Sequence, residues 1–113
     1  MSAITTHVLD TARGAPAAGV EVVLERQHNA EWQTIGRGLT DADGRQRALM
    51  ADTAVALAGI YRLRFDTGSY FASQSMTAFF PQVTVMFEVP EGRAHHHVPL
   101  LLSPFGYTTY RGS

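Results

Sequence analysis

The sequence contains neither cysteine nor lysine, and each absence excludes a class of chemistry. Without cysteine the chain forms no disulfide, has no thiolate nucleophile and offers no cysteine ligand to zinc. Without lysine it has no side chain for Schiff-base catalysis and no phosphate-binding loop of the kind that requires one. All nine basic residues are arginines, whose guanidinium groups keep their positive charge throughout the physiological pH range.

Long apolar runs and concentrated charge are also missing. No stretch approaches the roughly 20 apolar residues that a membrane-spanning helix needs, and the first residues lack the pattern of a secretory signal. The formal net charge is −1, and the arginines are spread along the chain rather than gathered as in nucleic-acid-binding proteins. We therefore expect a cytoplasmic protein that binds neither membranes nor nucleic acids.

The chain of 113 residues is long enough for one domain and too short for two of ordinary size. Hydrophobic residues make up 45% and charged residues 17%, a balance typical of a folded globular protein rather than a disordered one. The sequence has no internal repeat, linker or low-complexity tract. We therefore expect residues 1–113 to form a single domain with its own hydrophobic core.

Alternation of hydrophobic and polar side chains is the dominant local pattern. In residues 83–89 every second position is valine or phenylalanine, and two further segments repeat this period of two. The pattern is typical of strands with one buried face. The expected strands are residues 4–10, 20–25, 32–39, 61–65, 83–89, 98–102 and 105–111.

Turn-forming residues separate these segments. The Asp43-Gly44 pair favours a tight turn, and Pro81 is expected to open a strand. Residues 69–76 show no alternation, and Ser69 is of a type that caps helices, so we expect one short helix there. Together these patterns predict an all-β sandwich of mostly antiparallel strands.

Five histidines are the side chains best suited to proton transfer at neutral pH. His7 lies within the first expected strand. His95 and His97 share one face of a later strand, and His96 points to the other face. His28 lies at an expected hairpin tip, where we interpret it as a solvated loop residue.

Three interpretations of the histidines remain open at this point. His7, His95 and His97 could together bind zinc through their ring nitrogens. The histidine triplet could instead be a polar surface ladder without a chemical role. The third interpretation is general acid–base catalysis, in which two histidines share the proton transfers and an arginine stabilises an oxyanion. Arg45 and Arg111 are the candidate arginines, although spacing alone does not bring them to the histidines.

Two long segments resemble the transthyretin superfamily. Residues 7–22 read HVLDTARGAPAAGVEV, and residues 97–113 read HVPLLLSPFGYTTYRGS. Residues 43–45, 65–71 and 79–81 resemble the same superfamily between them. The resemblance spans essentially the whole chain.

Within the superfamily, two features are similar to the 5-hydroxyisourate hydrolases. Hormone-carrier transthyretins have lysine where this chain has His7, and they lack the Tyr-Arg-Gly-Ser found here at residues 110–113. The chain departs from the hydrolase pattern at His96, where tyrosine is usual, and at Thr108, where serine is common. Because His96 faces away from His97, we expect little effect on the chemistry.

The resemblance implies a transthyretin/prealbumin-like sandwich of two four-stranded antiparallel sheets with one short helix. It also implies a homotetramer, a dimer of dimers, with active sites at the dimer–dimer interface. By position, the resemblance assigns catalysis to His7, Arg45 and His97. The residues that it assigns to substrate binding are Tyr110, Arg111, Gly112 and Ser113.

The implied reaction is hydrolysis of 5-hydroxyisourate at its N1–C6 amide bond in the breakdown of urate, a purine. The product is 2-oxo-4-hydroxy-4-carboxy-5-ureidoimidazoline. The resemblance implies a cyclic amidase without metal or organic cofactor, in which His7 activates water, Arg45 polarises the carbonyl and His97 assists proton transfer. The alternative is a non-catalytic transthyretin-like carrier that binds a small aromatic ligand in a central channel.

Overall fold

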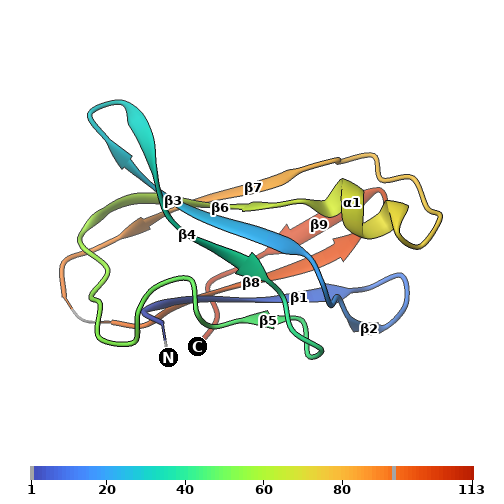
Figure 1. Cartoon of the computed structure of the whole chain (residues 1–113), viewed down its shortest axis with the longest axis horizontal. Coiled ribbons are helices and arrows are strands. Elements are labelled where there is room, and N and C mark those ends of the chain that lie inside the picture. The colour runs from blue at the N-terminus through green and yellow to red at the C-terminus, as the bar shows by residue number, and fades with distance from the viewer. Residues whose placement is uncertain (1, 93) are drawn as a thin grey trace.

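Two β-sheets pack face to face in the computed structural model, which describes residues 2–92 and 94–113 (Figure 1). The first sheet has the strand order β2–β1–β8–β9, with β5 also paired to β1, and the second has the order β4–β3–β6–β7. This arrangement confirms the predicted two-sheet sandwich. The strands are β1 (Ile4–Asp10), β2 (Ala15–Pro16), β3 (Glu21–His28), β4 (Glu31–Leu39), β5 (Arg45–Gln46), β6 (Gly59–Phe65), β7 (Val83–Val89), β8 (His96–Ser103) and β9 (Gly106–Thr109).

The core forms where the inward faces of the two sheets meet. Leu24 on β3, Leu63 and Phe65 on β6 and Leu100 on β8 are fully buried. Because side chains alternate between the faces of a strand, their neighbours face outward, as the exposed Met86 does on β7. Burial of each large apolar side chain contributes about 1.5–3 kcal/mol to folding. The alternation in the sequence therefore predicts both the strands and their inner faces.

β1 and β8 run parallel, the exception among the described strand pairs of these mostly antiparallel sheets. Their register places Thr5 beside His97 and His7 beside Pro99. A parallel pair needs a long connection between its strands, and here the whole second sheet lies between them in the sequence. Alternation within a segment does not reveal such a pairing, because it reports only which face is buried.

The turn before β5 holds that strand against β1. Gly44 has a φ of +77°, and its carbonyl accepts a hydrogen bond of 2.7 Å from the Val8 N–H. A Cβ atom at position 44 would lie 2.3 Å from the Val8 carbonyl oxygen, so both the backbone angle and the space require glycine. The predicted Asp-Gly turn is confirmed, and the β1–β5 register that follows it places Arg45 opposite His7.

Helix α1 spans Thr67–Ala72, which corrects the predicted range of 69–76. The cap is Asp66 rather than Ser69, because the Asp66 carboxylate accepts a hydrogen bond of 3.1 Å from the Ser69 N–H. Ser75 has a φ of +59°, so the helix cannot continue to residue 76. Across the described residues, no helix has the length and apolar character needed to cross a membrane.

Pro81 does not open a strand as expected, and the last strand is shorter than predicted. β7 begins at Val83, two residues after Pro81, whose carbonyl accepts a hydrogen bond from the Gly68 N–H at 2.8 Å. β9 covers only Gly106–Thr109 of the expected segment 105–111. The residues after Thr109 leave the sheet edge and are free to take part in the site described below.

Candidate active site

The outward face of β1 carries the first part of the candidate site. The side chains of Ile4, Thr6 and Val8 are fully buried between the sheets. The intervening Thr5 and His7 therefore point to the opposite face, away from the second sheet. This outward face of the first sheet is called the site face below.

β8 and β5 add residues to the site face. His96 is 6% exposed and points between the sheets, whereas His97 is half-buried on the site face. The parallel register sets His97 beside Thr5, and the antiparallel pairing of β5 sets Arg45 opposite His7. The structure thus brings His7, Arg45 and His97 together from three strands.

An open depression of about 300 Å³ lies on the site face. His7 lies opposite Arg45 on the neighbouring strand β1. The lining side chains are imidazoles, guanidinium groups and hydroxyls, a donor-rich set suited to carbonyl and oxyanion groups. They belong to Thr5, Arg45, Arg47, His95, His97 and Ser113.

The Thr5 hydroxyl holds the Nδ1 side of His97. The two atoms are 2.8 Å apart, and Thr5 Oγ1 also lies 3.0 Å from His95 Nε2. Burial lowers the pKa of His97, and the positive charge of Arg45 lowers it further. A lowered pKa keeps this imidazole neutral at neutral pH, and a neutral imidazole can accept a proton.

His7 is oriented by a backbone carbonyl. Its Nε2 atom lies 2.8 Å from the carbonyl oxygen of Asp43, in the turn that precedes Arg45. A carbonyl oxygen only accepts hydrogen bonds, so Nε2 must carry the proton. In the neutral ring, Nδ1 is then the nitrogen with a free lone pair, and it is the atom through which His7 can act as a base.

The chain after β9 returns to β8 and completes the site face. The Gly112 N–H donates a hydrogen bond of 2.8 Å to the His97 carbonyl, and this contact places Ser113 at the depression. A Cβ atom at position 112 would lie 2.6 Å from His97 Cδ2 and 3.1 Å from Pro99 Cγ. Only glycine therefore allows the backbone to pass so close to the His97 ring.

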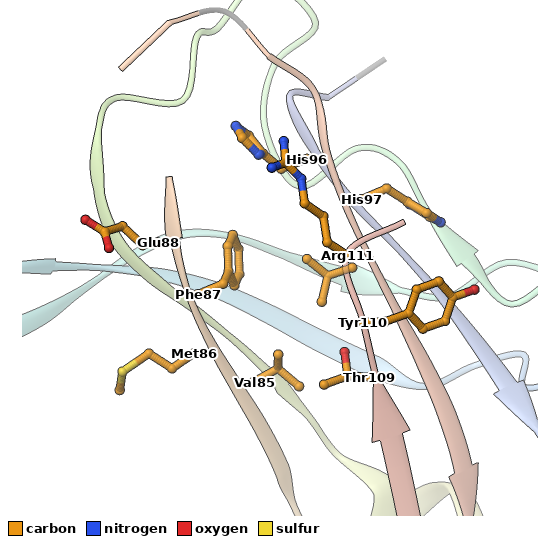
Figure 2. A pocket seen from close by; sticks show the side chains of 10 residues that line it. Val85, Met86, Phe87, Glu88, His96, His97, Thr109, Tyr110 and Arg111 are labelled. Atoms are coloured by element: carbon orange, nitrogen blue, oxygen red, sulfur yellow. The ribbon is translucent and has the colours of Figure 1, made fainter. Parts of the chain in front are cut away.

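Tyr110 and Arg111 line a different pocket, of about 240 Å³, between β7 and β8. Figure 2 shows the Arg111 side chain extending toward His96, while the Tyr110 ring points away from it. Burial lowers the pKa of His96, and the positive charge of Arg111 lowers it further. His97 borders both pockets, so the four terminal residues divide between its two sides.

The zinc hypothesis requires His7, His95 and His97 to face one point. His7 Nε2 instead lies against the Asp43 carbonyl, and His95 Nε2 lies against the Thr5 hydroxyl. Over residues 2–92 and 94–113, no group of three or more histidine, cysteine, aspartate or glutamate side chains is arranged to hold a metal ion.

Two lining residues, Thr5 and Arg47, were not among those predicted from the sequence. Thr5 shares its face of β1 with His7, and Arg47 shares its side of the chain with Arg45, so alternation is the signal that could have found them. His28 is exposed at the end of β3, as predicted, and its Nε2 atom lies 3.3 Å from Asn29 Nδ2.

Comparisons with known proteins identify the family of the chain. A model of the HIUase/Transthyretin family matches residues 4–112. A 5-hydroxyisourate hydrolase of Salmonella dublin is 48% identical over 110 residues, which make up 97% of this chain and 80% of that protein.

Solved structures with a similar fold include both a hydrolase and a transthyretin. The 5-hydroxyisourate hydrolase of Klebsiella pneumoniae matches with a TM-score of 0.86 and 37% identity, covering 100% of both chains. Sea bream transthyretin in complex with thyroxine matches with a TM-score of 0.89 and 36% identity, covering 96% of this chain and 93% of that one. By the family model and these relatives, the chain belongs to the HIUase/transthyretin family.

Proposed function

We propose that the protein hydrolyses 5-hydroxyisourate in the degradation of urate, a reaction assigned by name to its relatives in Salmonella dublin and Klebsiella pneumoniae. The observation that carries the proposal is one open depression lined by Arg45 and His97, with His7 directly opposite Arg45 on the neighbouring strand. The substrate is small, flat and rich in carbonyl and N–H groups, which suits recognition by guanidinium groups and backbone polar atoms. The enzyme is then a cyclic amidase that opens the N1–C6 bond and releases 2-oxo-4-hydroxy-4-carboxy-5-ureidoimidazoline.

The first step is activation of water by two acceptors. The water donates one O–H to Nδ1 of His7 and the other to Nε2 of His97, so that an oxygen lone pair faces C6 of the substrate. His7 takes the proton as the oxygen attacks, and the Asp43 carbonyl, 2.8 Å from Nε2, stabilises the resulting imidazolium. A positioned base of this kind contributes about 10² to 10⁴ in rate.

The second step is cleavage of the ring. Attack on C6 places negative charge on the carbonyl oxygen, which the Arg45 guanidinium stabilises, a contribution of about 10² to 10³ in rate. The oxyanion then re-forms the carbonyl, the C6–N1 bond breaks, and N1 takes the proton that His7 received, assisted by His97. Both histidines end the cycle neutral, and the new carboxylic acid at C6 releases its remaining proton to solvent and leaves as a carboxylate.

The terminal residues complete substrate binding in this proposal. Ser113 lies in the depression itself, and Gly112 brings the backbone against His97. Tyr110 and Arg111 border His97 from the adjacent pocket and contribute to the substrate site from that side.

The proposed assembly is a homotetramer of single domains, each formed by residues 1–113, with the active sites at the dimer–dimer interface. Support comes from the open site face and from the exposed aromatic side chains of Phe79, Phe105 and Tyr107, since contiguous exposed apolar surface favours association. Analytical ultracentrifugation tests the tetramer. The cytoplasmic location is a further prediction, which cell fractionation tests.

The decisive experiment follows the absorbance decay of 5-hydroxyisourate generated in the cuvette by urate oxidase. The proposed enzyme accelerates this decay in proportion to its concentration. A decay that stays at the spontaneous rate contradicts the proposal and favours a small-ligand carrier, the function suggested by the likeness to sea bream transthyretin in complex with thyroxine. The proposal requires no cofactor, so prolonged treatment with a chelator should leave the rate unchanged.

A further inference from the structure

Thr5 lies at an unusual place for a hydroxyl on an outward strand face. It is only 2% exposed, although it belongs to the face of β1 that points away from the second sheet. Its hydroxyl oxygen lies 2.8 Å from His97 Nδ1 and 3.0 Å from His95 Nε2. The two imidazole rings stack at 6.4 Å between centroids, with planes 16° apart, so one hydroxyl bridges two nearly parallel rings.

The number of protons that this bridge can share limits the tautomers of both rings. A threonine hydroxyl has one proton to donate, and a neutral imidazole has one N–H and one acceptor nitrogen. If Thr5 donates to His95 Nε2, it must accept from His97, which then carries its proton on Nδ1. If Thr5 donates to His97 instead, that ring carries its proton on Nε2. When the Thr5 proton is donated within the bridge, two arrangements are possible, and the tautomer of each ring then determines that of the other.

The positive charge of Arg45 can favour one of the two arrangements. It shares the depression with His97, and its positive charge acts on that ring. A lone pair that faces a cation is favoured over an N–H that faces it, because the N–H carries a partial positive charge. The favoured arrangement keeps the His97 proton on Nδ1, against Thr5, and leaves Nε2 as an acceptor toward the depression.

We propose that Thr5 is a positioning residue that locks His97 in the Nδ1–H tautomer, with His95 as the far acceptor of the Thr5 proton. Only the expected effect on the reaction rate rests on the proposed function; the tautomer itself does not. In the hydrolysis above, the locked tautomer presents His97 Nε2 as the second acceptor for the attacking water. Without the hydroxyl, the His97 ring populates both tautomers, and the fraction with an N–H at Nε2 cannot accept from water.

The test compares three proteins: the parent, Thr5→Val and Thr5→Ser. Valine has the shape of threonine without the hydroxyl, whereas serine keeps the hydroxyl. Nitrogen-15 chemical shifts of the imidazole rings report the tautomer directly, and the His97 signals are assigned by their loss in His97→Gln. We expect a single Nδ1–H tautomer in the parent and in Thr5→Ser, and a mixture in Thr5→Val. We also expect kcat to fall about 10- to 100-fold in Thr5→Val, with a smaller change in KM and recovery in Thr5→Ser.

Thr6→Val is the matched control. Thr6 is the next residue of β1, and its buried hydroxyl donates a hydrogen bond of 2.6 Å to the Val98 carbonyl rather than to a histidine. This variant also loses a buried hydroxyl, so it reports the effect on stability alone, and its His97 signals should match those of the parent.

Several outcomes overturn the inference. One is a parental protein whose His97 ring carries its proton on Nε2, a result that can be detected without any variant. Another is a Thr5→Val protein that keeps a single Nδ1–H tautomer, and a third is a Thr5→Ser protein that behaves like Thr5→Val. If the parent shows the expected tautomers but does not hydrolyse 5-hydroxyisourate, the bridge stands and the proposed function fails, so the two failures are distinguishable.

Discussion

The outward faces of the two sheets differ in the groups that surround their arginines. On the second sheet, Arg62 and Arg64 both donate to the Glu25 carboxylate, at 2.6 and 2.7 Å. On the first sheet, Arg45 lies near His7 and His97, and within the described residues no ion pair engages it. On one face two arginines share the Glu25 carboxylate, whereas on the other Arg47 pairs with Asp41 at 3.4 Å and Arg45 lies next to imidazoles.

The second face has the properties of a structural network. Burial by itself raises the pKa of Glu25, but hydrogen bonds from Arg64 and Arg62 bring it below the ordinary value of 4.5. The Arg62 guanidinium also lies 4.1 Å from the centre of the Trp32 ring. A cation without a carboxylate partner is a local departure from this pattern, and such departures are typical of functional sites. The contrast distinguishes a face that stabilises the fold from the face proposed to react.

The largest effects are expected from substitutions on the site face. His7→Ala, Arg45→Ala and His97→Ala should each lower kcat/KM for 5-hydroxyisourate by about 10² or more, because each removes a base, an acceptor or an oxyanion donor. Circular dichroism and sedimentation should show a folded protein in each case. His28→Ala is the control and should keep the parental rate. Near-parental rates in all three site variants would contradict the assignment.

Gly112→Ala should have the next largest effect. It tests how closely the site face is packed. The added Cβ would lie 2.6 Å from His97 Cδ2, so the ring or the terminal backbone must move. We expect kcat to fall about 10- to 100-fold, as for small displacements of catalytic groups. Gly106→Ala is the matched control, because its nearest contact would be Ser103 Oγ at 3.9 Å. Equal activity in the two variants would mean that the contact with His97 does not matter.

Glu25→Gln is the corresponding test on the second sheet. The substitution keeps the shape of the side chain and removes the charge that Arg62 and Arg64 share. We expect the free energy of unfolding to fall by about 1–3 kcal/mol, measured by urea denaturation, with kcat unchanged. A loss of activity without a loss of stability would reverse the roles assigned to the two faces.

The smallest effect concerns the pH dependence of stability. Unfolded His96 takes up a proton near its ordinary pKa of 6.5, whereas folded His96, buried and near Arg111, takes it up only at lower pH. The stability contributed by neutral His96 is therefore complete above about pH 6.5 and is lost as the pH falls through the folded pKa. His97 acts with the same sign.

His96→Phe should make the loss of stability on acidification smaller, because one of the two histidines no longer takes up a proton on unfolding. Urea midpoints measured between about pH 5 and 7.5 give the slope for each protein. His28→Ala, altered at an exposed histidine at the end of β3, is the control. An unchanged slope in His96→Phe would show that His96 does not contribute.

Much of the fold could be predicted because it depends on local patterns. The expected strands at residues 4–10 and 83–89 match β1 and β7 residue for residue, since alternation reports a buried face directly. The start of α1 was predicted two residues too late, because Asp66 and Ser69 are both good caps and sequence alone does not rank them.

The convergence of the site could not be predicted from spacing. It depends on the parallel pairing of β1 with β8 and on the close approach of Gly44 to Val8, neither of which has a local signature. The residues His7, Arg45 and His97 were therefore named through the family resemblance rather than through periodicity. Thr5 was not predicted because its role depends on contacts with His95 and His97, which are far from it in the sequence.

The parallel pairing also has a consequence for folding. Thr5 and His97 touch although 92 positions separate them in the chain. Contacts of such high contact order form slowly, because the intervening segments must be ordered before the ends can meet. Any partly folded species that lacks this strand pair also lacks the candidate site, so the recovery of enzymatic turnover during refolding would time the last step of assembly.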